Sequence, residues 1–181
     1  MCSTVITSAI GYAYWVVAAH IYSAYDVGLA SAFVSAMMLT SISANLGIGS
    51  ALVQMLPQRE SGDAWSLTLN IGIAMGILIS LLGGIIVAVA LPFLAPQFAI
   101  GKGYAAYTLI FIVGVPLSTV AILLDQTFVA ERATSNLVAR NTVFALLKLP
   151  LMILLVQVGA LGIFSSWVLA VAATVILAGL V

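Results

Sequence analysis

The sequence predicts an all-α protein, a polytopic bundle of about six transmembrane helices. Of its 181 residues, 64% are apolar and only 6% are charged. A soluble domain of this length would carry about 45 charged residues, so a water-facing exterior is excluded. Disorder is excluded too, because it requires low hydrophobicity and high charge. The apolar residues gather in runs long enough to cross a bilayer core of about 30 Å, which takes about 20 helical residues.

The spans are separated by polar connections that hold nine of the ten charges. The six predicted spans, which together form one bundle, are residues 4–21, 29–56, 65–91, 104–124, 142–158 and 163–181. A β-barrel is excluded because its strands are shorter, about ten residues, and alternate in polarity. The first span ends in aromatic residues typical of a membrane interface, namely Tyr12, Tyr14, Trp15 and Tyr22.

Small residues and prolines shape the expected packing of the spans. The third span has Gly72 and Gly76 four residues apart, a spacing that favours close helix contact. In the second span, Gly47 and Gly49 are expected to loosen the helix locally. Pro116 and Pro150 each remove one backbone hydrogen bond, which invites a kink in the fourth and fifth spans.

Several kinds of function are excluded by counting residues. Net charge is zero, so the chain presents no basic field for nucleic acid. Cys2 and His20 are the only residues of their types, which leaves no disulfide framework and no cysteine or multi-histidine metal site. We therefore expect no cofactor and no enzymatic acid–base chemistry. His20, at the end of the first span, is expected to be an interfacial anchor.

The distribution of basic residues favours a cytoplasmic N-terminus. In that orientation the inside connections hold Arg59, Arg132 and Arg140, and the outside connections hold only Lys102. This excess agrees with the positive-inside rule.

Lys148 is the one charge that lies well within a predicted span. It follows Arg140 by about 12 Å of helix, which places it near mid-depth if Arg140 marks the interface. Ionisable groups at that depth are candidates for function. One alternative is snorkelling, in which the side chain carries its ammonium back to the surface. The other is an ion pair with Asp125, which would lie within reach if the fourth and fifth spans form a hairpin turning near residues 134–135.

Asp125 would oppose the helix dipole if the fourth span ended there. The helix is therefore expected to continue past it, or a cation to neutralise it. Arg132, Asn136 and Arg140 are spaced so that they share one face of a cytoplasmic helical extension. That face is either solvated or placed to meet lipid headgroups or a substrate pyrophosphate.

The second span contains a polar stretch with two interpretations. Its small residues favour helix packing, and its hydroxyls, with Asn45, could instead line a polar cavity. The candidate substrate or cavity residues of the chain are Asn45, Asp125, Arg140, Asn141 and Lys148, and the candidate headgroup ligands are Arg132 and Arg59.

Three segments resemble one transporter family. The front run from Gly11 to Pro57 contains YDVG (Tyr25 to Gly28) and NLGIGSALVQMLP (from Asn45). The other segments are DQTFVAERATSNLVARNTVFALLKLPL, from Asp125, and GALGIFSSWVLA, from Gly159. In spacing and small residues, these are similar to the oligosaccharidyl-lipid flippases of polysaccharide biosynthesis. Those proteins are the Wzx-type O-antigen and repeat-unit transporters, within the superfamily that includes multidrug extruders.

The resemblance covers the whole chain and implies more than composition does. Family members have two lobes, whose central cavity carries a polyprenyl-pyrophosphate-linked oligosaccharide across the bacterial cytoplasmic (inner) membrane by alternating access. The chain would be the N-terminal lobe, with the C-terminal lobe and the substrate as its partners. The apolar ending at Val181 likewise suggests a partial chain.

Departures from related families favour the glycan branch. The first span has no acid, unlike a cation-coupled multidrug extruder, and the first four spans have no arginine, unlike lipid II flippases. Either relative remains an alternative, as does a non-catalytic membrane subunit. An integral-membrane enzyme is disfavoured, because the spans hold no acidic pair and His20 lies at an edge.

Overall fold

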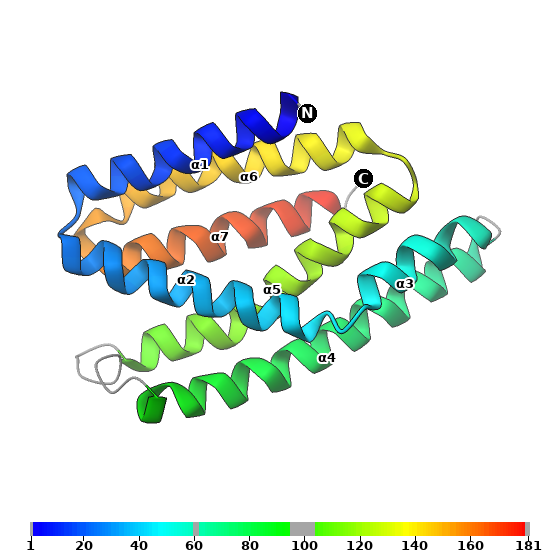
Figure 1. The fold of residues 1–181 in the computed structure, drawn as a ribbon, viewed down its shortest axis with the longest axis horizontal. Helices are drawn as coiled ribbons and strands as arrows, with labels where there is room; N and C mark the ends of the chain where they lie inside the picture. The colour runs from blue at the N-terminus through cyan, green and yellow to red at the C-terminus, as the bar shows by residue number, and fades with distance from the viewer. Residues whose placement is uncertain (1, 60–61, 95–103, 180–181) are drawn as a thin grey trace. The chain divides into compact units, whose positions relative to one another are not determined.

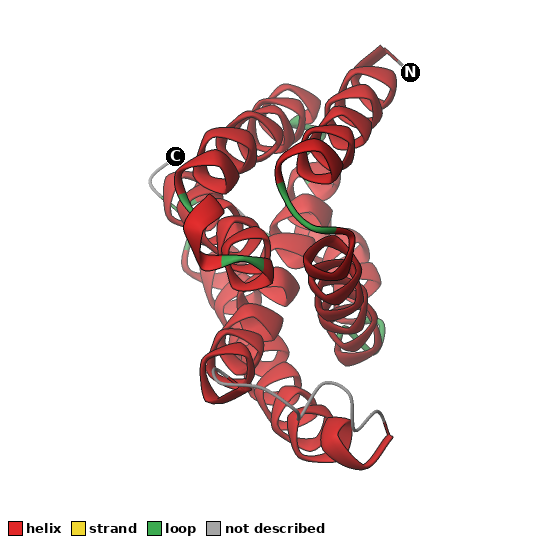
Figure 2. Ribbon diagram, turned by 90° about the vertical axis from the view of Figure 1, so that its left-hand side faces the viewer, coloured by secondary structure: helices red, strands yellow, loops and turns green. Residues whose placement is uncertain are grey.

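The structure is a computed structural model that describes residues 2–59, 62–94 and 104–179. Within these ranges the chain forms seven α-helices and no strand (Figures 1 and 2), which confirms the predicted all-α polytopic bundle. The elements are α1 (Cys2–Ile21), α2 (Ala24–Ala44), α3 (Ile48–Met55), α4 (Asp63–Leu94), α5 (Tyr104–Ala130), α6 (Thr134–Leu154) and α7 (Ala160–Ala178), with short 3₁₀ helices η1 (Leu56–Gln58) and η3 (Val156–Val158).

Five described helices are long and apolar enough to cross a membrane, so the chain is a multi-pass membrane protein. They are α2, α4, α5, α6 and α7. In α1 the described apolar stretch is shorter, Ile10–Ile21, and the side chains of residues 2–9 lie outside the description. The first predicted span therefore stays a prediction. The connection at 95–103, with Lys102, and the end of the last span at Val181 also lie outside the described residues.

The prediction of one continuous span over residues 29–56 is wrong. α2 ends at Ala44, and α3 begins at Ile48 after a break of three residues, Asn45 to Gly47. Leu46 (φ 41°) and Gly47 (φ 82°) adopt left-handed backbone conformations that no helix can contain. The side-chain Oδ1 of Asn45 accepts a hydrogen bond of 2.8 Å from the Gly49 amide and so helps to begin α3.

Two other span boundaries also differ from the prediction. α5 continues to Ala130 rather than ending at residue 124, and Asp125 therefore lies inside it, as the dipole argument allowed. α6 occupies Thr134–Leu154 rather than residues 142–158. Between them, Arg132 is left-handed (φ 56°) and the Ala133 amide bonds to the Phe128 carbonyl at 2.8 Å. This is the hydrogen bond of a helix C-terminal cap, and it ends α5 because Arg132 cannot continue the helix.

The chain divides into two compact units, each described by itself. Unit 1 comprises Met1–Ala36 and Val138–Val181, and unit 2 comprises Met37–Leu137. Unit 1 therefore contains α1, the first part of α2, most of α6, and α7. Unit 2 contains the end of α2, then α3, α4 and α5 (Figure 1).

Unit 1 is tied together at its turns by side-chain hydrogen bonds. Ser23 precedes α2, and its hydroxyl accepts a bond from the Asp26 amide and donates one of 2.6 Å to Asp26 Oδ2. The other carboxylate oxygen, Oδ1, accepts a bond from the Ala160 amide at the start of α7, where the helix dipole favours an anion. The Tyr22 hydroxyl donates to the Met152 carbonyl at 2.6 Å. Burial raises the pKa of Tyr22, and the charge of Asp26 raises it further, so this donor stays protonated.

Unit 2 has close helix contacts at glycines of α4, beside hydrogen bonds from the Ser41 hydroxyl to the Val115 carbonyl and from the Tyr104 hydroxyl to the Ala88 carbonyl. A Cβ added at Gly76 would lie 2.6 Å from Leu123 Cδ1 on α5, and one at Gly72 would lie 3.0 Å from Leu52 Cδ2 on α3. The backbones approach this closely because glycine has no side chain, as the spacing of Gly72 and Gly76 predicted. Leu52 and Leu123 pack with Leu56 in a buried apolar core.

Candidate functional site

The candidate site is built around Lys148, which lies in the middle of the apolar helices of unit 1. Its side chain is only 4% exposed. The side chain is buried along nearly all of its length, which argues against the snorkelling alternative. A buried cation in an apolar environment is costly unless its surroundings stabilise it, so its neighbours decide what the site can do.

Three aromatic rings from three helices surround the Lys148 ammonium. Nζ lies 4.6 Å from the ring centroid of Trp167 (α7), 4.8 Å from that of Tyr14 (α1) and 5.1 Å from that of Phe144 (α6). The faces of these rings carry negative partial charge, and each such contact stabilises a desolvated cation by about 2 kcal/mol. We call Lys148 with these three rings the aromatic cage.

The rings of the cage are fixed by one another and by hydrogen bonds. Trp167 packs edge-to-face on Tyr14, with centroids 5.7 Å apart, and on Phe144, with centroids 5.4 Å apart. The Tyr14 hydroxyl donates to the Ile163 carbonyl at 3.1 Å and lies 3.1 Å from the Ser166 hydroxyl. α1 therefore cannot rotate against α7 without breaking buried hydrogen bonds.

Unit 1 offers Lys148 no free carboxylate. Asp26 is the only acidic side chain in its two segments, residues 1–36 and 138–181, and both its oxygens bind the turns of unit 1. Among the described residues, the Trp167 Nε1 hydrogen is also buried without an acceptor. The cage thus combines a cation with an unused donor, which suits an anionic or hydrogen-bond-accepting group.

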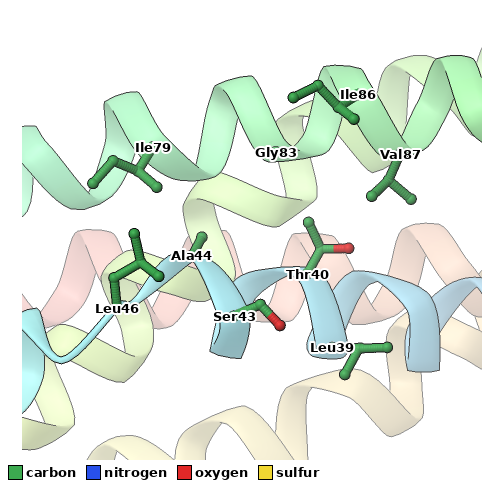
Figure 3. Close-up of a pocket in the computed structure, with 9 residues that line it drawn as sticks. All are labelled: Leu39, Thr40, Ser43, Ala44, Leu46, Ile79, Gly83, Ile86 and Val87. Carbon is green, nitrogen blue, oxygen red and sulfur yellow. The ribbon is translucent and has the colours of Figure 1, made fainter.

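A second feature lies in unit 2, beside the break between α2 and α3. A groove of about 390 Å³ runs between α2 and α4. Figure 3 shows Thr40 and Ala44 pointing toward α4, and Ile79 and Val87 pointing back toward α2. The remaining lining residues are Leu39, Ser43, Leu46, Gly83 and Ile86. Thr40 and Ser43, from the polar stretch of the second predicted span, line this groove, but Ser41 and Asn45 do not, and the rest of its lining is apolar. The predicted polar cavity stays a prediction.

The structure places the other candidate cavity residues in different surroundings. Asn45 helps to begin α3, as described above. Arg140 and Asn141 are neighbours on α6 in unit 1, where Arg140 Nη2 donates to Asn141 Oδ1 at 3.0 Å. Asp125 is half-buried in unit 2. Because Asp125 and Lys148 belong to different units, their ion pair stays a prediction.

The candidate headgroup residues Arg132 and Arg59 are both exposed outside the α-helices. The prediction that Arg132 shares a helix face with Asn136 and Arg140 is wrong, because α6 begins only at Thr134. His20 is exposed, and its Nδ1 lies 2.8 Å from the Val16 carbonyl of its own helix.

The aromatic partners of Lys148 were not identified as site residues from the sequence. Tyr14 was assigned to an interfacial cluster, but it is fully buried, whereas its neighbour Tyr12 is 75% exposed. One available signal was the four-residue spacing of Tyr14, Ala18 and Tyr22, all buried on one face. Trp167 carried no comparable signal, since an apolar span has no polar face against which to orient it.

The comparisons with known proteins do not identify a relative. No protein-family model, no curated protein and no solved structure matches the chain.

Proposed function

We propose that the chain is the N-terminal lobe of a flippase that moves a polyprenyl-pyrophosphate-linked oligosaccharide across the bacterial cytoplasmic membrane. The observation that carries this proposal is the aromatic cage, a buried cation that no carboxylate of unit 1 neutralises. A stability role alone does not account for such a group, because an apolar side chain of similar size would cost less to bury. A transient anionic ligand does account for it.

The pyrophosphate of the substrate is the anionic group that we assign to the cage. A lysine ammonium is a compact cation suited to phosphate oxygens, and Trp167 Nε1 would add a neutral donor beside it. The same three rings would stabilise the ammonium after the headgroup leaves. The site would therefore tolerate both the loaded and the empty state, as alternating access requires.

The helix break in unit 2 also supports a transporter. Non-helical backbone at membrane depth is tolerated where it is buried or lines a cavity, and discontinuous helices are a recurring feature of secondary transporters. The proposed role is transport without enzymatic chemistry and without a resident cofactor.

The test is complementation of a flippase-null strain by the full-length protein with changes at Lys148. Lys148→Met removes the charge but retains an unbranched side chain, and we expect it to lower surface polysaccharide by at least about tenfold, a change of about 1.4 kcal/mol. Lys148→Arg keeps the charge and should retain part of the activity. The matched control is Lys102→Met, in a predicted connection outside the described residues, which should leave polysaccharide unchanged.

A stability measurement separates lost function from lost folding. Because Lys148→Met replaces a buried unpaired cation with an apolar group, we expect the purified variant to be more stable by about 1–3 kcal/mol. Normal surface polysaccharide from Lys148→Met at matched expression would overturn the proposal. A variant that is both inactive and unstable would show that Lys148 serves the fold instead.

A further inference from the structure

The groove beside the helix break lies level with the middle of α4. Two contacts set this register between antiparallel segments. A Cβ at Gly83 would lie 3.6 Å from Thr40 Cγ2, and one at Gly72 would lie 3.0 Å from Leu52 Cδ2. In two antiparallel helices, residues at the same level have numbers with a constant sum. This sum is 123 for the first pair and 124 for the second, so residues 45–47 lie at the level of about residues 76–79. α4 runs from Asp63 to Leu94, and these residues are its midpoint.

Most of the backbone amides at the break are hydrogen-bonded within the protein. The Asn45 amide bonds to the Ser41 carbonyl, the Leu46 amide to the Ser43 carbonyl, and the Ile48 amide to the Asn45 carbonyl. The Gly49 amide bonds to the Asn45 side chain, as described above. The Gly47 amide makes no such bond to the described residues, so the bonded amides limit, but do not remove, the cost of placing this segment in a hydrocarbon environment.

The walls of the groove favour hydrocarbon over water. Seven of the nine lining residues have no polar side-chain atom, the exceptions being Thr40 and Ser43. The edge carries exposed Leu39, Leu46 and Ile86, so the groove is open to its surroundings. Apolar concavities of this kind stay dry, and an empty groove would forfeit the dispersion contacts of its walls. At mid-depth the available apolar material is lipid chain.

We infer that this groove holds one acyl chain of a membrane phospholipid. The chain would lie along α4 between the helix break and Val87, packed against the small residues Ala44 and Gly83. In that position it fills the space where α2 stops and stabilises the break from the lipid side. This site does not depend on the proposed transport function.

Photocrosslinking in vesicles tests the inference. The probe is phosphatidylcholine with a diazirine near the middle of one acyl chain, and crosslinks are mapped by mass spectrometry. We expect about threefold higher yield at the groove residues than at Leu78 and Leu82. The expected excess is modest because chain and wall are equally apolar and only van der Waals packing favours the bound position. Leu78 and Leu82 are depth-matched controls, exposed on the same helix.

Filling the groove should remove the excess. Gly83 is open apart from an ordinary contact with Thr40, so Gly83→Leu places a side chain in the groove without backbone conflict. The matched control is Gly28→Leu, which adds the same side chain on α2 where nothing lies within 4 Å. Loss of the excess in Gly83→Leu alone supports the site. Equal yields at the groove and at Leu82 in the unaltered protein would overturn it.

Two further arms distinguish other occupants. Cys2 is the only native cysteine, so a Cys2→Ser, Leu46→Cys protein reports whether water reaches the groove. Slow reaction with a water-soluble maleimide, compared with Cys2→Ser, Ser135→Cys, supports an acyl chain. Equally fast reaction would show a hydrated groove and overturn the inference. Displacement of the probe by polyprenyl phosphate, but not by excess phosphatidylcholine, would also overturn it by identifying a prenyl chain as the occupant.

Discussion

Unit 1 ties its helices together with hydroxyls and a carboxylate, whereas unit 2 combines close glycine contacts with two hydroxyl bonds, from Ser41 to the Val115 carbonyl and from Tyr104 to the Ala88 carbonyl. In unit 1 the side chains of Tyr14, Tyr22 and Asp26 reach backbone groups far away in the sequence. In unit 2 the backbone of α4 approaches Leu123 and Leu52 directly at Gly76 and Gly72. Both solutions answer one problem, since lipid provides no hydrophobic force to drive apolar helices together.

The difference has a functional correlate. Polar side chains fix the orientation of the helices around the aromatic cage, because each hydrogen bond forms only when its helix is at one angle about its own axis. Glycine contacts fix the distance between two helices but allow one helix to shift slightly along the axis of the other. The helices of the unit with the buried cation are oriented by directional bonds. The unit with the broken helix has directional bonds of its own, from Ser41 and Tyr104, together with its glycine contacts.

The largest expected effect comes from filling the glycine contact of unit 2. In Gly76→Leu the new side chain would collide with Leu123, which is fully buried and would have to shift together with its neighbours. We expect a loss of about 3 kcal/mol or more, and a fall in the thermal midpoint of about 6 °C or more. Gly11→Leu, where nothing lies within 4 Å, should change little. An equal midpoint for both variants would show that unit 2 is not held by this contact.

A smaller loss is expected from removing one directional bond of unit 1. Tyr14→Phe deletes the hydroxyl that reaches the Ile163 carbonyl and Ser166, and we expect about 1–1.5 kcal/mol of destabilisation. Hydrogen exchange of α7 should rise with it. Tyr12→Phe is the control, because Tyr12 is exposed on the same helix. If the two variants behave alike, hydrogen bonding does not hold α1 to α7.

The smallest effect is expected at a polar side-chain pair near the surface of unit 2. Trp65 Nε1 donates to Glu131 Oε1 at 2.7 Å, but Glu131 is exposed and Trp65 is only half-buried. A double-mutant cycle with Trp65→Phe and Glu131→Ala should give a coupling energy of at most about 1 kcal/mol. A coupling energy above that of the buried Tyr14 bond would contradict the division between the two units.

Most of the fold could be predicted because the chain has only ten charges in 181 residues, and long apolar runs lie between them. The break at Asn45–Gly47 was predicted only as a local loosening at Gly47 and Gly49. Its extent could not be predicted, since hydropathy continues through NLGIG and the helix ends at the left-handed backbone angles of Leu46 and Gly47. Asn45 was singled out as a cavity residue, and in the structure its side chain accepts a hydrogen bond from the Gly49 amide in the first turn of α3.

Only part of the candidate site could be predicted from the sequence. Lys148 could be found because a single charge inside an apolar span has no ordinary explanation. Its partners Tyr14 and Trp167 could not, because they lie on helices distant in sequence and every face of such a span is apolar. The hydrophobic pattern that orients a soluble helix is absent here.

The two segments of unit 1 also impose an order on biosynthesis. Tyr14 and Ile163, which share a hydrogen bond, are 149 residues apart, and the whole of unit 2 is synthesised between them. At about 5–20 residues per second, the ribosome needs roughly 7–30 s to bridge that interval. The sequence of unit 2 is therefore complete before the Tyr14 hydroxyl can meet its acceptor. A ribosome stalled before Ala160 would leave unit 2 with its whole sequence and unit 1 without α7, so the two units differ in when they can first fold.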